Sequence, residues 1–72
     1  MQINEKIREL REDRDLKQAT IGALLGVNQS YYSKQERGDK PFQIEHIKIL
    51  CEYYGISSDY LLGLPKGLMW PR

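Results

Sequence analysis

The sequence has 72 residues, which is enough for one small domain and too few for two separate cores. Apolar residues make up 40% of the chain and charged residues 29%, a balance that is too apolar for a disordered chain, and no apolar run approaches the ~18 residues of a membrane span. The formal net charge of +1 gives no overall attraction to nucleic acid or membrane, and the single cysteine, Cys51, excludes an internal disulfide and a thiolate metal cage.

The first predicted element is an amphipathic helix over about residues 3–14. Ile3, Ile7 and Leu10 recur at spacings of four and three, which places them on one helix face. Arginines and glutamates alternate over the rest of the wheel at i, i+3 and i+4 spacing. This pattern is typical of an exposed, salt-bridged face and not of a catalytic carboxylate pair.

Two short helices are predicted next. In residues 18–25 the apolar side chains fall on one face, and Gly26 ends the helix in the manner of a left-handed C-terminal glycine. Asn28 is a good N-cap for a third helix, which runs to Arg37 and stops at Gly38. This third helix has few apolar residues, as is typical of an exposed helix that contacts a partner.

The distribution of acidic residues also singles out this part of the chain. No aspartate or glutamate occurs from Leu16 to Gln35, although the chain has ten acidic residues. The same stretch carries Lys17, Lys34 and many amide and hydroxyl side chains. Such a surface can lie against a polyanion without repulsion.

A fourth helix is predicted for residues 44–54 and a short fifth helix for residues 59–62. The stripe that the fourth helix is expected to bury consists of Ile44, Ile47, Leu50, Cys51 and Tyr54. His46 falls off this stripe and is expected to be a surface histidine. Tyr32, Tyr54 and Tyr60 are expected to be core aromatics with the hydroxyl at the rim. Either Ser57 or Ser58 can cap the fifth helix.

The second and third predicted helices, joined by a short turn, form the sequence pattern of a helix-turn-helix. Gly22 provides the small residue that is needed where the two helices cross, and Gly26 provides the residue that tolerates positive φ in the turn. The apolar interior of the unit is expected to consist of Ile21, Leu25, Val27 and Tyr32. The outward face of the third helix is then free to enter a DNA major groove, which is wide enough for one helix.

These residues resemble the Cro/C1-type helix-turn-helix (XRE) family of phage-repressor-like regulators. The resemblance rests on Leu16-Lys17-Gln18, Ile21-Gly22, Leu24 to Ser30 and Tyr32 to Gly38, with matching flanks in Ile7 to Glu12, Ile44 to Gly55 and Asp59 to Gly63. It covers about residues 3–63 and implies an all-α, compact five-helix, lambda-repressor-like DNA-binding domain. The chain is therefore expected to divide into a helix-turn-helix domain, residues 1–63, and a C-terminal tail, residues 64–72.

The chain departs from the family pattern in three places. Asp15 stands where the family often has glycine, so a tighter or differently closed loop is expected after the first helix. Tyr32 and Gln35 stand where it commonly has apolar residues, so the inner side of the third helix is expected to be more polar. Phe42 and Gln43 replace a common Pro-Ser entry into the fourth helix.

The resemblance implies the DNA-contacting residues. Base reading falls to Gln29, Ser30, Tyr31 and Lys34, and the side-chain chemistry agrees, because glutamine can pair with adenine and lysine can donate to guanine. Tyr31 can stack on a sugar, contact a thymine methyl or simply lie on the surface. Phosphate contacts are expected from Lys17, Gln18, Asn28, Arg37 and Lys40. Arg11 and Glu36 occupy positions that often pair in this family, so a structural role is expected for both, as for Gly22 and Gly26.

The expected function is sequence-specific binding of double-stranded DNA by a cytoplasmic transcriptional repressor. The sequence offers no nucleophile–base pair, metal ligands or phosphate loop, so neither enzymatic activity nor a metal or cofactor is expected. A homodimer on an inverted-repeat operator is expected, with the fifth helix and the tail as its interface. Leu68, Met69 and Trp70 in the tail can fold back on the domain, pack on a partner or stay loose. The alternative is an antitoxin or partner-binding adaptor on the same fold.

Overall fold

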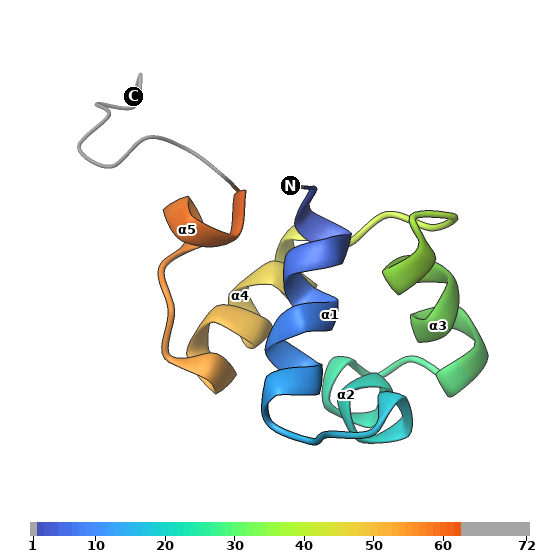
Figure 1. The fold of residues 1–72 in the computed structure, drawn as a ribbon. Coiled ribbons are helices and arrows are strands. Elements are labelled where there is room, and N and C mark those ends of the chain that lie inside the picture. Colours follow the sequence, from blue (N-terminus) through green and yellow to red (C-terminus); the bar gives the residue numbers. More distant parts are fainter. Residues whose placement is uncertain (1, 63–72) are drawn as a thin grey trace.

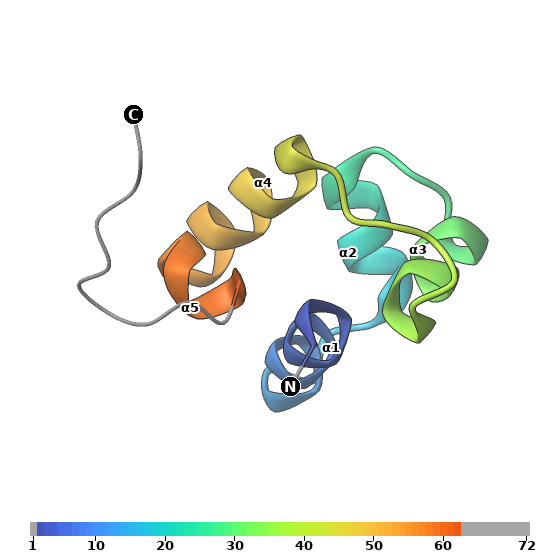
Figure 2. The same ribbon diagram turned by 90° about the horizontal axis from the view of Figure 1, so that it is seen from above.

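The computed structural model describes residues 2–62, which form five helices. The helices are α1 (Ile3–Asp13), α2 (Gln18–Leu25), α3 (Gln29–Arg37), α4 (Ile44–Tyr54) and α5 (Ser58–Leu62). Figure 1 shows α1 crossing the molecule, with α2 and α3 to one side of it and α4 and α5 to the other. The view from above shows the same division, and α1 packs against both α3 and α5 (Figure 2). The all-α, five-helix fold expected from the sequence is therefore confirmed.

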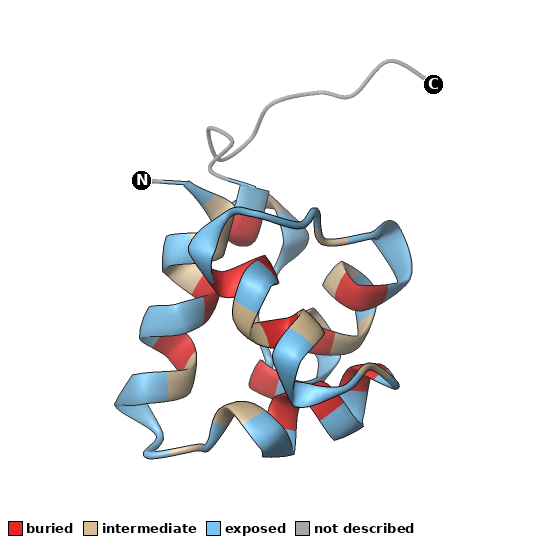
Figure 3. Ribbon diagram, turned by 90° about the vertical axis from the view of Figure 1, so that its right-hand side faces the viewer, coloured by how far each residue is buried: buried red, intermediate tan, exposed pale blue. Residues whose placement is uncertain are grey.

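The core lies where these helices meet. Its buried apolar side chains are Ile7, Leu10, Ile21, Leu25, Tyr32, Leu50, Tyr54 and Leu61, so every helix contributes at least one. Figure 3 shows the buried positions on the inner sides of the helices and the exposed positions on the outer sides. None of the helices in the described residues is long and apolar enough to cross a membrane.

Glycines end three of the helices, as the sequence predicts. Gly26, Gly38 and Gly55 follow α2, α3 and α4 with φ of 76°, 88° and 68°, values that L-amino acids with a side chain rarely adopt. The observed bounds of α2, α3 and α4 match the predicted ones. The helix α5 begins at Ser58, and the Ser57 Oγ accepts a hydrogen bond from the Tyr60 amide at 3.2 Å, which identifies Ser57 as its cap.

The turn after α1 is closed by Asp15 in place of glycine. Asp15 has a φ of 53°, and the Asp15 and Leu16 amides donate to the Glu12 and Arg11 carbonyls at 3.0 and 3.1 Å. These two bonds are those of a Schellman motif, in which the residue after the helix takes a left-handed conformation. The different closure expected here thus consists of an aspartate in the conformation that glycine favours, which aspartate tolerates better than most residues.

Three expectations about α4 and α5 were wrong. Ile44 is 73% exposed, whereas His46, expected on the surface, is only 8% exposed. The reason is that α4 buries the row at spacing four, His46, Leu50 and Tyr54, rather than the purely apolar row that starts at Ile44. Tyr60, expected in the core, is 54% exposed because five-residue α5 turns only Leu61 inward. Ile47 and Cys51 are partly buried, and Leu50, Tyr54 and Tyr32 are buried as expected. The hydroxyl oxygens of Tyr32 and Tyr54 are buried as well, so the expectation that they lie at the rim was wrong.

Polar contacts attach the loop after α3 to α4, and α5 to α1. The buried Gln35 donates from Nε2 to the Pro41 carbonyl at 2.9 Å and lies 3.1 Å from His46 Nδ1, so the inner side of α3 is more polar, as expected. On the opposite side, Lys6 Nζ donates to the Tyr60 carbonyl at 2.9 Å and lies 5.3 Å from the centre of its ring. The contacts of Gln35 fix the loop after α3 on α4, and those of Lys6 fix α5 on α1.

The predicted boundary after residue 63 and the predicted tail lie outside the described residues.

Candidate nucleic-acid interface

The helices α2 and α3 pack closely because of the turn between them. The Val27 amide donates to the Gly22 carbonyl at 2.9 Å, and the Asn28 Oδ1 accepts the Tyr31 amide at 2.7 Å as the N-cap of α3. A Cβ atom added to Gly22 would lie 3.2 Å from the Val27 carbonyl oxygen and 3.5 Å from the Tyr32 Cβ. A residue larger than glycine would therefore push the turn away from α2.

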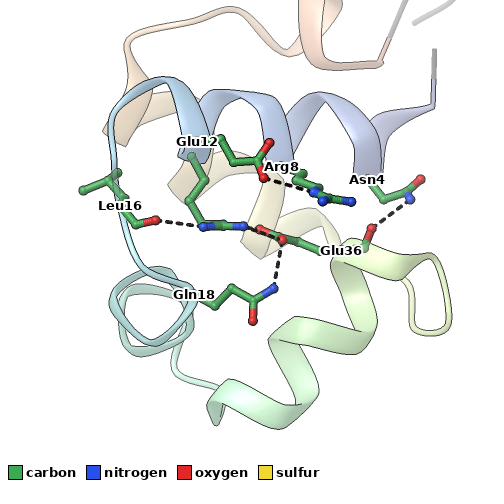
Figure 4. Close-up of polar contacts among 7 residues, drawn as sticks. Asn4, Arg8, Glu12, Leu16, Gln18 and Glu36 are labelled. Atoms are coloured by element: carbon green, nitrogen blue, oxygen red, sulfur yellow. Dashed lines mark hydrogen bonds and ion pairs between the residues drawn. The ribbon is translucent and has the colours of Figure 1, made fainter.

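A buried carboxylate joins this unit to α1. Glu36 Oε2 accepts from Arg11 Nε at 2.6 Å, and Glu36 Oε1 accepts from Arg11 Nη2 at 3.1 Å and from Gln18 Nε2 at 3.0 Å (Figure 4). Arg11 Nη1 also donates to the Leu16 carbonyl at 2.8 Å. We call these four residues, Arg11, Leu16, Gln18 and Glu36, the Glu36 network. It connects α1, the segment before α2, the first residue of α2 and the last turn of α3.

The Glu36 network keeps its carboxylate ionised. Burial alone would raise the pKa of Glu36, but the hydrogen bonds from Arg11 and Gln18 and the positive charge of Arg11 outweigh it, and the pKa is lowered. The hydrogen bond to Glu36 in turn raises the pKa of the Arg11 guanidinium. Burial, with the negative charge of Glu36 nearby, also raises the pKa of the Tyr32 hydroxyl. Glu36 therefore acts as a charged acceptor at neutral pH.

The outward side of α3 carries most of the residues expected to contact DNA. Gln29, Ser30 and Lys34 are exposed, and Tyr31 is half-buried. A shallow hollow between α2 and α3 brings together Gln18, Gln29, Ser30, Ser33 and Arg37. Tyr31 lies apart from them, in a second hollow that Gln43 and His46 help to line. The structure thus gathers Gln29 and Ser30 beside Gln18 and places Tyr31 toward α4.

The residues expected to bind phosphate surround this face. Lys17 and Asn28 are exposed at the N-terminal ends of α2 and α3, and Lys40 is exposed in the loop after α3. Arg37, at the end of α3, is also exposed, and its Nε donates to Asp39 Oδ2 at 3.2 Å. Gln18 is half-buried, because its Nε2 is held by Glu36.

Sequence reasoning did not assign a site role to Ser33. It lines the hollow because it lies four residues after Gln29 and three after Ser30, on the same side of α3. That helical spacing is visible in the sequence and is the signal that would have identified it. Among the described residues no group of three or more histidine, cysteine, aspartate or glutamate side chains is arranged to hold a metal ion.

This arrangement, a short helix, a glycine turn and a second helix with an exposed polar face, defines a helix-turn-helix domain of the repressor type. The chain belongs to the helix-turn-helix family, whose model matches residues 7–61. It is similar to the cryptic phage CTXphi transcriptional repressor RstR of Vibrio cholerae, with 35% identity over 51 residues, 71% of this chain and 46% of that protein. It is also similar to the antitoxin PezA of Streptococcus pneumoniae, with 29% identity over 66 residues, 92% of this chain and 42% of PezA.

Solved structures share the fold. The P22 c2 repressor protein in complex with synthetic operator 9T superposes with a TM-score of 0.75 at 31% identity, over 86% of this chain and 94% of that one. A transcriptional regulator from Listeria innocua superposes with a TM-score of 0.84 at 26% identity, over 94% of this chain and 64% of that one. The chain spans about half the length of the curated relatives it matches.

Proposed function

We propose that this chain binds double-stranded DNA at specific sequences and regulates transcription there, as a repressor. The observation that carries the proposal is the face that α2 and α3 present together. It is exposed, rich in amides and hydroxyls, and free of acidic residues from Leu16 to Gln35. A single helix with such a face fits a major groove. The similar P22 c2 repressor was solved with a synthetic operator, which supports DNA as the ligand.

In the proposed complex the exposed start of α3 reads the bases. Gln29 can bond the N6 and N7 atoms of an adenine, and Lys34 can donate to O6 and N7 of a guanine. Ser30 has a hydroxyl that can donate or accept, and Ser33 lies beside it in the same hollow. Tyr31, half-buried toward α4, reaches a sugar or a thymine methyl at the edge of this surface.

The remaining candidates fix the orientation of the domain on the phosphate backbone. Lys17 and Asn28 mark the N-termini of α2 and α3, where backbone N–H groups and the helix dipole favour an anion. Gln18 adds a side-chain amide at the first of these ends, and Arg37 and Lys40 add charges at the other end of α3. Phosphate contacts of this kind set the register and carry no sequence information directly.

We further propose that the chain acts as a homodimer on an inverted repeat. One recognition helix covers only a few base pairs, and two related half-sites supply the specificity needed to find one site in a genome. Tyr60 and Leu62 of α5, 54% and 46% exposed, leave an apolar surface that a second copy can cover. The tail residues expected to contribute, Leu68, Met69 and Trp70, lie outside the described residues.

A second candidate function is that of an antitoxin, and the similarity to PezA favours it. An antitoxin on this fold would use the same DNA face and a separate surface for its toxin. Deletion of the gene distinguishes the two functions. Loss of an antitoxin is harmful only while the toxin gene is present, whereas loss of a plain repressor has no such dependence.

Selection from a random duplex library at fixed salt tests the proposed function. We expect an enriched inverted repeat whose half-site centres lie ~34 Å apart, one turn of DNA. The logarithm of the binding constant should fall linearly with the logarithm of salt concentration, because phosphate contacts release counterions. Failure to enrich any sequence, or binding that does not depend on salt, would contradict the proposal.

A further inference from the structure

The side chain of Gln18 is held before any ligand arrives. Its Nε2 donates to Glu36 Oε1 at 3.0 Å. An ionised carboxylate can only accept, so the amide nitrogen must face Glu36 and the amide oxygen must face away, as Figure 4 shows. One of the two N–H bonds of Gln18 is thereby occupied, and the other remains for a second acceptor. The orientation of this amide is therefore set by Glu36 and not by solvent.

Glu36 is itself a rigid anchor. Its side chain is only 3% exposed, and the Arg11 guanidinium bonds both of its oxygens. Asn4 Nδ2 also donates to the Glu36 carbonyl at 3.0 Å, which ties the backbone of the same residue to α1. A side chain this deeply covered lies behind the surface and does not contact a ligand directly. Any effect of Glu36 on binding must then pass through a neighbour that reaches the surface.

We propose that Glu36 is a positioning residue for DNA binding that acts through Gln18. This inference rests on the proposed contact between Gln18 and the DNA backbone. A free glutamine side chain loses rotamer freedom when it is immobilised in an interface, and a side chain that is already fixed loses less. By fixing the amide in the free chain, Glu36 should strengthen DNA binding about three- to ten-fold, because this is the usual entropic cost of immobilising one long side chain on binding.

A double-mutant cycle on DNA binding tests the coupling. Replacing both members of the buried pair with apolar residues of similar size, Arg11→Met with Glu36→Leu, removes the acceptor for Gln18 without leaving a buried charge unpaired. The replacement also leaves the net charge unchanged. In the wild-type background we expect it to weaken binding to the selected duplex about three- to ten-fold. Combined with Gln18→Ala, the same replacement should weaken binding no further.

The matched control removes the ion pair between Arg8 and Glu12, which also lies on α1 but is exposed, with side chains 61% and 51% exposed. Arg8 lies near Gln18 and Arg37, so Arg8→Gln with Glu12→Gln can change DNA affinity, but the factor should be the same with and without Gln18→Ala. An equal loss from the buried-pair replacement with and without Gln18 would show that the network acts only on the fold, and would overturn the proposal. No loss in either background would overturn it as well.

A measurement on the unaltered chain decides the question if the double replacement does not fold. Nitrogen-15 relaxation of side-chain amides should show Gln18 to be restrained in the free chain, compared with the exposed Gln43 at the start of α4. If Gln18 is as mobile as Gln43, it is not held, and the proposal fails. If Gln18→Ala alone leaves DNA affinity unchanged, the proposed contact fails and the positioning role with it. Absence of DNA binding by the wild-type chain would instead reject the proposed function.

Discussion

Replacing Glu36 with alanine is expected to remove a large part of the stability of the domain. The substitution deletes three side-chain hydrogen bonds and leaves the Arg11 guanidinium, whose side chain is 13% exposed, with only the Leu16 carbonyl as its partner in the Glu36 network. Removing one partner of a buried ion pair costs about 3–5 kcal/mol. A chain of 72 residues at ~0.05–0.15 kcal/mol per residue has a free energy of unfolding of only ~4–11 kcal/mol.

Urea unfolding followed by circular dichroism measures this loss. The control is Glu12→Ala, which breaks the exposed pair with Arg8 and should cost no more than about 0.5 kcal/mol. Replacing Arg11 with methionine and Glu36 with leucine together should recover much of the loss, because no charge is left unpaired. The reasoning would be refuted if Glu36→Ala cost no more than Glu12→Ala, or if the double replacement were less stable than the single one.

Three further outcomes follow from the same structure. The pKa of Glu36 is lower in the folded chain, so its contribution to stability is fully present above the ordinary value of about 4.5 and is lost as pH falls through the folded value. The difference in unfolding free energy between wild type and Glu36→Ala should therefore shrink as the pH falls from about 7 to about 3. Asp39→Asn should raise DNA affinity about two- to five-fold in fluorescence anisotropy, because it frees Arg37 for a phosphate; unchanged affinity would remove Arg37 from the proposed contacts. Asp15→Gly should stabilise the domain and Asp15→Ala should destabilise it, each by about 1 kcal/mol, because the residue has a φ of 53°. The melting temperature should rise for the first variant and fall for the second, and shifts of the same sign would contradict this.

The sequence predicts the helix boundaries well because local chemistry decides them. Gly26, Gly38 and Gly55 end helices in a conformation that depends on the residue itself, and Asn28 caps α3 with its own side chain. Such signals need no knowledge of the neighbouring helices. The bounds of α2, α3 and α4 therefore follow from the sequence alone.

The faces that the helices bury are harder to predict. Counting apolar residues places Ile44 inside and His46 outside, but the buried position of His46 depends on Gln35, a polar residue from another helix that satisfies its ring nitrogen. The same holds for the candidate interface. The family resemblance singles out Gln18, but only the packing of α2 on α3 reveals that Glu36 takes one of its N–H bonds. Contacts between polar groups of different helices leave no periodic signal in a single sequence.

The two sides of α3 have consequences for how such a protein can change its target. Tyr32, Gln35 and Glu36 are buried and hold the helix in place, whereas Gln29, Ser30 and Lys34 are exposed. Residues at the exposed positions can therefore be exchanged with little effect on folding, since surface substitutions usually alter stability by less than about 0.5 kcal/mol. A new binding preference can then arise by single substitutions, each giving a folded chain. The same separation makes the domain a suitable starting point for grafting the reading residues of one regulator onto another.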